Sequence, residues 1–405
     1  MSLDLFSPDV LRDPYPLFSR LRAGATATFA DGLGVWVVSR REEIRAVLAD
    51  PETFTNALTI APLMPVCPHA GQILGGLTAE VPIAARDGLA HARARRALMA
   101  TFPSNPRRAG AHEPAIRAIA DDLIDAMLLR GEADLVRDFA WEFAVRVILG
   151  IVGVPDEAHE RIKRWSDGRF AILWGQTTEA EQLRIARDTA AFWEFCQQLV
   201  AVRVREPRQD LVSALIGYRS AGASPLTQRE VASLVFDVLS AGHETTSNML
   251  SNGILQLLAG GAWDELVAEP ARIADALEEI LRYDTPTPGW LRFTARPATV
   301  GDVDIPAGQR VLLLLGAANR DETSWPDAER FDIGRADARE HLSFSAGRHF
   351  CVGAALARLE GRVALEALCA RLPALHLRAG YDPRYVPNVA FRMLESLPVA
   401  WRPAI

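Results

Sequence analysis

Residues 341–360, HLSFSAGRHFCVGAALARLE, place one cysteine between a turn-like segment and a helical pattern. Gly347 and Gly353 flank Cys351, and His349 precedes it by two residues. The apolar residues that follow recur at helical spacing, so the cysteine directly precedes a predicted helix. The N–H groups and positive dipole end of such a helix favour an anionic sulfur. A lone cysteine is more often an inert buried thiol, so its role depends on the rest of the chain.

The composition describes a chain with a large core and no basic excess. It has 405 residues, 49% of them hydrophobic, and a formal net charge of −7. We find no internal repeat, low-complexity tract or linker that would separate domains, so we expect one domain over 1–405. The acidic balance argues against nucleic acid as a partner. No membrane anchor or signal peptide is predicted, and we expect a cytoplasmic monomer.

Helical periodicity dominates the chain, for example in AIRAIADDLIDAMLL (115–129) and TAAFWEFCQQLVAVRVRE (189–206). Strand-like patterns are short: GVWVVS (34–39), FTARPATVGDVDIP (293–306), RVLLLL (310–315) and fragments near the C-terminus. The sequence therefore predicts a mainly α fold, with a large helical domain and small peripheral β-sheets.

The longest helical pattern, 226–259, is predicted to cross the whole molecule. Its middle is polar: Gly242 costs up to about 1 kcal/mol relative to alanine in a helix, and Glu244, Thr245 and Thr246 stand side by side. A threonine hydroxyl that bonds the carbonyl four residues back opens a polar notch in an apolar helix. The alternative is a threonine-rich face that lies on solvent.

Glu279 and Arg282 lie on one face of another predicted helix, ADALEEILRYDTPTP. Alone, such a pair is usually a solvated surface contact worth about 0.5 kcal/mol. Arg330, in the turn-rich loop ANRDETSWPDAERFDIGR, is available as a further partner for the glutamate.

Taken in order along the chain, these stretches resemble the cytochrome P450 haem-thiolate monooxygenases. The resemblance covers nearly the whole chain. It is carried by the F-x-x-G-x-x-x-C-x-G loop, the E-x-x-R helix, the central helix and the segment DGLAHARARRAL, through Phe344, Gly347, Cys351, Gly353, Glu279, Arg282, Ala241, Gly242, Glu244, Thr245, Thr246, His91 and Arg95.

The resemblance implies haem b, bound noncovalently between the central helix and the helix after the cysteine. It makes Cys351 the axial ligand of the haem iron, with a thiolate that favours O–O cleavage. The glycines of the loop would allow tight turns near the porphyrin, and Phe344 would shield the sulfur. The other implied cofactor-binding residues are two of the central helix and four that would contact the propionates: Ala241, Gly242, His91, Arg95, Arg292 and His349.

The resemblance also assigns two further sets of residues. Glu244 and Thr245 would organise water for proton delivery to the activated oxygen. Glu279, Arg282 and Arg330 would form a buried network that locks the cysteine loop. Two positions depart from the usual pattern: Ser345 stands where glycine is frequent, and Glu244 stands where many relatives have aspartate.

The function implied is a monooxygenase that inserts one oxygen atom of O2 into an apolar or amphipathic small molecule, by hydroxylation or epoxidation, in bacterial secondary metabolism. Electrons would come from a separate ferredoxin, since no reductase domain is expected. The alternatives are a peroxide-driven or atypical haem-thiolate oxidation, such as desaturation or C–C coupling, and a non-catalytic haem or ligand-binding protein.

Substrate contacts are expected in segments 59–81, 164–176 and 286–290, with Val235, Leu239, Trp290 and Met393 as pocket residues. Their mostly apolar character does not distinguish a macrolide, terpene, fatty acid or aromatic substrate. Six arginines are candidates for a positive ferredoxin-docking patch: Arg93, Arg96, Arg107, Arg108, Arg348 and Arg358.

Overall fold

The computed structural model describes residues 3–166, 168–221 and 224–402. Helices make up most of it, as predicted. The helices of the first half are α1 Pro8–Arg12, α2 Tyr15–Ala23, α3 Arg41–Ala49, α4 Pro68–Gly75, α5 Gly88–Thr101, α6 Pro106–Gly110, α7 Glu113–Leu128, α8 Glu142–Val152, α9 His159–Ser166, α10 Arg169–Trp174, α11 Glu179–Arg205 and α12 Leu211–Gly217. Those of the second half are α13 Gln228–Ala241, α14 Glu244–Ala259, α15 Trp263–Ala268, α16 Ile273–Tyr283, α17 Leu315–Ala318 and α18 Ala354–Arg371.

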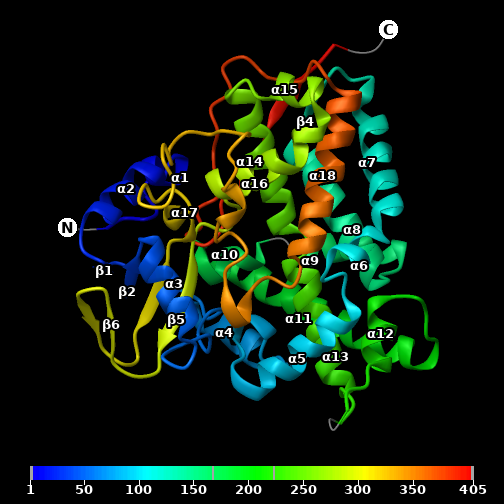
Figure 1. Ribbon diagram of the computed structural model, residues 1–405. Helices are drawn as coiled ribbons and strands as arrows, with labels where there is room; N and C mark the ends of the chain where they lie inside the picture. The colour runs from blue at the N-terminus through cyan, green and yellow to red at the C-terminus, as the bar shows by residue number, and fades with distance from the viewer. Residues whose placement is uncertain (1–2, 167, 222–223, 403–405) are drawn as a thin grey trace.

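The strands are short and lie at the edge of the helical body, as Figure 1 shows for β1, β2 and β5. A five-stranded sheet has the order β1-β2-β8-β5-β3, in which β2 and β8 are parallel and the other neighbours are antiparallel. A second sheet has the order β4-β10-β9, and β6 pairs with β7. Their bounds are β1 Ala27–Ala30, β2 Val35–Val38, β3 Phe54–Thr55, β4 Glu132–Asp134, β5 Trp290–Thr294, β6 Ala298–Val300, β7 Val303–Ile305, β8 Arg310–Leu313, β9 His376–Leu377 and β10 Pro398–Ala400.

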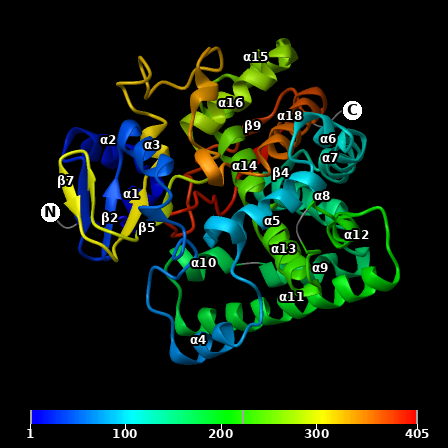
Figure 2. The ribbon, with the colours of Figure 1, turned by 60° about the horizontal axis from the view of Figure 1, so that its bottom comes forward.

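The main core lies among the helices. Buried side chains of α7, α8, α11, α13, α14, α16 and α18 form one continuous apolar cluster, and two smaller clusters join the sheet to the N-terminal helices. In Figure 2, α13 and α14 run through the middle of this body while α11 crosses below them. In the part of the chain that the structure describes, no helix has both the length and the apolar composition needed to cross a bilayer.

The central helix differs from the prediction in one respect, because it is not continuous. α13 ends at Ala241 and α14 begins at Glu244, so Gly242 and His243 interrupt it at the polar middle. A Cβ on Gly242 would lie 2.7 Å from Cγ1 of Ile148 in α8. Glycine is required here because the backbone packs directly against a neighbouring helix. That contact also means that Gly242 serves packing with α8, a role the sequence did not predict.

Candidate active site

The interrupted helix presents a polar, accessible face in the middle of the core. Ala241 is exposed and Thr245 is half-buried, whereas Ser240, His243 and Glu244 are each at most 5% exposed. The Thr245 hydroxyl donates to the Ala241 carbonyl at 3.0 Å, the four-residue bond expected at a polar notch. The accessible positions therefore border an opening inside the protein and not its outer surface.

Cys351 also lies at such an opening. Its side chain is accessible to solvent, yet burial among the surrounding protein raises the pKa of its thiol. The backbone N–H groups of Gly353 and Ala354 and the charge of Arg95 act in the opposite direction. The two N–H groups at the start of α18, together with Arg95 of α5, favour the thiolate, as the sequence pattern indicates.

The loop before Cys351 has the tight turns predicted for it. Gly347 has φ +68°, and Ser345 has φ +60°, a left-handed conformation that a residue with a side chain rarely adopts. A Cβ on Gly347 would lie 3.0 Å from the Leu48 carbonyl. Gly353 has an ordinary backbone, and a Cβ there would lie 3.8 Å from the Cys351 sulfur. Gly347 therefore permits the turn, while Gly353 keeps the space beside the sulfur open.

Four nitrogen-bearing side chains gather beside this loop, from α5, β5 and the loop itself. The rings of His91 and His349 stack with centroids 4.0 Å apart. Burial, followed by the charges of neighbours that include Arg292 and Arg95, lowers the pKa of His349 to about 3. Asp87 lies 3.6 Å from His349 Nε2. These four residues come from distant segments, and only the family resemblance indicated that they belong to one site.

This group has the chemistry of an anion site. Arg292 is only 3% exposed, and burial lowers its pKa to about 10. Within the described residues its guanidinium donates to the Leu291 carbonyl, and no carboxylate lies within ion-pair distance of Arg292 or Arg95. Buried cations without a paired acid are costly. The two carboxylates of haem propionates fit this arrangement, and the accessible Cys351 fits the haem iron.

The E-x-x-R pair is deeply buried. Arg282 donates from Nε and Nη2 to the two Glu279 oxygens at 2.7 and 2.8 Å, and both side chains are 0% exposed. Arg330 was expected to complete this network, and that prediction is wrong. Its side chain is 69% exposed and lies 3.7 Å from Asp332, whereas Arg335 reaches Glu279 at 3.5 Å. Only the backbone carbonyl of Arg330 takes part, as an acceptor for Arg282.

A second buried acid, which the sequence analysis missed, joins the same helix to the cysteine loop. Glu278, the neighbour of Glu279, accepts from Arg358 of α18 at 2.7 and 2.9 Å, and His341 Nε2 lies 3.2 Å away. The Arg358 guanidinium lies over the Phe344 ring, 4.6 Å from its centroid. Two adjacent glutamates in an apolar helical pattern were the available signal, because only one face of a surface helix is normally polar.

The substrate-pocket residues have mixed outcomes. Val235 and Leu239 are 0% exposed and pack in the main core, so neither lines an opening as predicted. The apolar positions of α13 that are accessible are instead Val238 and Ala241. They lie on a face of the helix about one residue around from the predicted one. Trp290 and Met393 are half-buried and pack against the apolar cluster that contains Phe391. The Trp290 and Phe391 rings are in edge-to-face contact. Asp167, in the predicted segment 164–176, lies outside the described residues.

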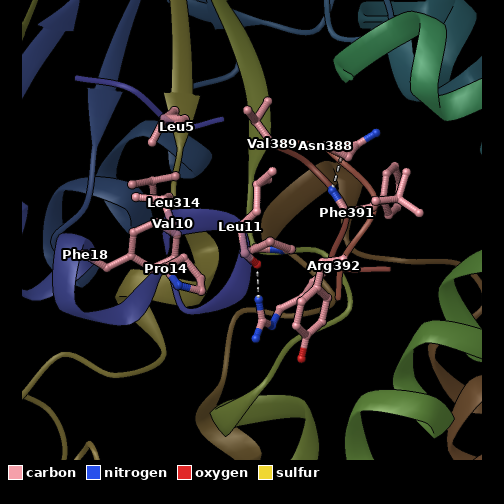
Figure 3. A pocket seen from close by; sticks show the side chains of 13 residues that line it. Leu5, Val10, Leu11, Pro14, Phe18, Leu314, Asn388, Val389, Phe391 and Arg392 are labelled. Carbon is pink, nitrogen blue, oxygen red and sulfur yellow. Dashed lines mark hydrogen bonds between the residues drawn. The ribbon is translucent and has the colours of Figure 1, made fainter. Parts of the chain in front are cut away.

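A separate cavity of about 40 Å³ lies between the N-terminal helices and the C-terminal segment (Figure 3). Arg392 donates to the Leu11 carbonyl at its border, and Asn388 accepts from the backbone of Phe391. This volume holds a few waters but no substrate-sized molecule. Arg392 and Asn388 are hydrogen-bonded within the protein, so this cavity is a packing feature of the joined ends of the chain.

The arginines expected to face a ferredoxin are partly committed elsewhere. Arg93 donates to Glu230 at the start of α13, and Arg358 is bound to Glu278. Arg348 pairs with Glu52 at the surface. Arg96, Arg107 and Arg108 remain exposed side chains. A smaller patch than predicted is therefore available for docking.

Comparisons with known proteins agree with this geometry. The cytochrome P450 family model matches residues 78–260 and 273–372. The chain is 34% identical to cytochrome P450 107B1 of Saccharopolyspora erythraea, over 97% of this chain and 96% of that protein. It is 35% identical to mycinamicin IV hydroxylase/epoxidase of Micromonospora griseorubida, over 91% and 90%. The solved structure of cytochrome P450 CREJ in complex with (4-ethylphenyl) dihydrogen phosphate matches with a TM-score of 0.93 and 36% identity, covering 98% of this chain and 99% of that one.

The helical fold, the accessible cysteine before α18 and the cationic group beside it define a haem-thiolate protein. The chain belongs to the cytochrome P450 family, and its cofactor is haem b. It is an enzyme of the monooxygenase type.

Proposed function

We propose that this enzyme inserts one oxygen atom from O2 into an apolar or amphipathic small molecule, by hydroxylation or epoxidation. The observation that carries this proposal is the accessible Cys351 at the start of α18, in a molecule whose central helix opens at Ala241 and Thr245. The relatives named as a hydroxylase/epoxidase and as the monooxygenase PikC of Streptomyces venezuelae support a role in bacterial secondary metabolism. A separate ferredoxin would supply electrons to this cytoplasmic enzyme.

In this proposal Cys351 binds the haem iron, and His91, Arg95, Arg292 and His349 bind the propionates. When bound, haem with a thiolate ligand activates O2 and favours O–O cleavage. The substrate would lie against the accessible positions of the central helix, Ala241 and Thr245. The clusters around it are apolar, so they orient a molecule by shape more than by charge.

Thr245 and Glu244 are proposed to manage protons at the notch. The Thr245 hydroxyl donates to Ala241, so its oxygen lone pairs remain available to accept from a water molecule. Glu244 is buried beside it and lies in the field of Arg169 of α10. A carboxylate and a hydroxyl at one helix break can orient a short water chain toward the reaction site.

The test of the ligand assignment is the spectrum of the reduced carbon monoxide complex. The wild-type protein is expected to show the red-shifted Soret band of a thiolate complex, and Cys351→Ala should lack that band. Cys67→Ala, which removes a thiol on α4's N-terminal side, is the matched control and should keep it. A thiolate band that persists in Cys351→Ala would refute the assignment.

The proton-handling role predicts uncoupling in Thr245→Ala. Haem binding and NAD(P)H-driven oxygen consumption with surrogate ferredoxin should continue, while product per NAD(P)H falls and hydrogen peroxide rises, because the positioned proton donor is lost. Thr245→Ser keeps the hydroxyl and should retain most of the coupling. Equal coupling in wild type and Thr245→Ala would rule out the relay.

A further inference from the structure

The segment that leads from α4 to α5 is fastened to α13 by side chains of that helix. The N–H of Glu80 donates to Ser233 Oγ at 2.8 Å, and the N–H of Ile83 donates to Asp237 Oδ2 at 2.9 Å. Leu77, Ala79 and Ile83 of the segment pack, partly buried, against the main core. In Figure 2 this blue chain passes across α11 and α13 on its way to α5. We call residues 77–86 the clasped segment.

The fastening points lie next to the accessible face of the central helix. Ser233, Asp237 and Ala241 follow one another at intervals of four, so they form one ridge of α13. Ala241 is the exposed residue that borders the opening. The clasped segment is therefore held one and two helical turns before that opening.

Two cationic side chains lie near Asp237. Arg169 of α10 and Arg86 of the clasped segment both lower its pKa through their charges, as does the Ile83 N–H. Burial outweighs them and raises the pKa of Asp237 to about 6. One buried Nη atom of Arg86 has no hydrogen-bond partner among the described residues. The Asp237 side chain is half-buried by its solvent exposure. An acid with a perturbed pKa and a defined set of partners is a candidate for a functional role.

The other contacts of the clasped segment are weaker. Glu80 pairs with Arg229 at 3.1 Å, but both side chains are well exposed, so this pair contributes little. Trp193 of α11 donates to Thr78 Oγ1 at 3.2 Å. The hydrogen bonds from the backbone N–H groups of Glu80 and Ile83 to the Ser233 and Asp237 side chains therefore fix the path of the segment over α13.

We propose that Asp237, assisted by Ser233, is a positioning residue that holds the clasped segment against α13 beside the substrate opening and thereby selects against large ligands. The inference rests on the proposed function for the identity of that opening. It goes beyond it by naming the residues that control entry. No catalytic step is assigned to Asp237.

Hydrogen–deuterium exchange on the haem-loaded protein tests the fastening directly. In Asp237→Ala the amides of residues 80–86 should exchange about tenfold faster, the loss expected for one hydrogen bond to a charged acceptor. Asp237→Asn keeps an acceptor oxygen and should stay within about threefold of wild type, and Ser233→Ala should accelerate exchange at Glu80. Ser240→Ala is the matched control, because its hydroxyl donates to the Phe236 carbonyl within α13.

Ligand-binding kinetics separate a clasp from general loosening. Stopped-flow association and dissociation rates of 4-phenylimidazole should both rise about tenfold in Asp237→Ala, while cyanide rates and the carbon monoxide spectrum stay unchanged. Unchanged exchange at 80–86 in both alanine variants would overturn the proposal, as would equal acceleration of cyanide and 4-phenylimidazole. If Asp237→Ala does not retain haem, Ser233→Ala, which removes the other acceptor of the segment, decides the same question. None of these measurements requires substrate turnover, so a failure here is distinct from a failure of the proposed monooxygenase reaction.

Discussion

Ser345 is a strained residue in the loop that carries Cys351. Its φ of +60° lies in the left-handed region, and its hydroxyl is buried without a partner among the described residues. This conformation costs about 1–2 kcal/mol for a residue with a side chain. The sequence departs from the common glycine at this position, and the backbone explains why glycine is common there.

Ser345→Gly should therefore stabilise the haem-bound protein by about 1 kcal/mol, after the larger chain entropy of glycine is subtracted. We expect a rise of about 1–2 °C in the apparent Tm, measured by circular dichroism. Ser343→Gly is the control, because the Ser343 hydroxyl donates to the Leu281 carbonyl, and it should lower the Tm. A lower Tm in Ser345→Gly would show that the serine makes a compensating contact.

At the scale of elements, α16 is joined to the loop before Cys351 by two adjacent acids that face different partners. Glu279 binds Arg282 and Arg335, and Glu278 binds Arg358 and His341. Removal of one partner from a buried charge network leaves an uncompensated charge. These contacts hold α18 and the cysteine loop in one orientation.

Arg335→Met should destabilise the protein by about 2 kcal/mol, because Glu279 loses one cationic partner. The loss is smaller than for a fully stranded charge, since Glu279 keeps Arg282 and the Asp332 N–H as partners. Arg330→Met is the matched control in the same loop and should change stability by less than about 0.5 kcal/mol, since its side chain is exposed. Chemical denaturation followed at the Soret band measures both. Equal losses would restore Arg330 to the network.

Over the whole molecule, acid stability depends on the buried acids. Burial acts to raise the pKa of Glu278, but hydrogen bonds with His341 and Arg358 outweigh it and lower the pKa to about 2. A lowered carboxyl pKa stabilises the folded state above the unfolded pKa of about 4.5, and this stabilisation disappears as pH falls toward 2. Its size is about 3 kcal/mol.

Glu278→Gln should consequently lose stability at pH 7, and its stability should fall less steeply than that of the wild type between pH 4.5 and 2. Thermal denaturation across this pH range, followed by circular dichroism, measures the difference. Glu52→Gln, at a surface carboxylate that is 71% exposed, should keep the wild-type slope. If stability falls with pH in parallel for Glu278→Gln and wild type, Glu278 is not the source of this acid sensitivity.

The sequence by itself determined the mainly helical fold, the peripheral strands, the cysteine before α18 and the polar notch in the central helix, but not the interruption of that helix at Gly242 and His243. These features follow from local spacing, glycine positions and helix chemistry, which neighbouring residues specify. The family resemblance alone indicated that one site contains His91, Arg95, Arg292 and His349. Residues so far apart in the chain carry no local signal of their proximity. The single domain over 1–405 and the monomeric state remain predictions.

Only the tertiary structure decided which charged residues are buried together. Arg335 replaces Arg330 as a partner of Glu279 because the loop turns the side chain of Arg330 to solvent. Val235 and Leu239 face the core, since the rotation of α13 depends on its contacts with α8 and α11 and not on its own apolar pattern. The contact of Asp237 with the clasped segment could not be predicted from the sequence for the same reason. A carboxylate accepts from a backbone N–H that is distant in sequence only after the chain has packed.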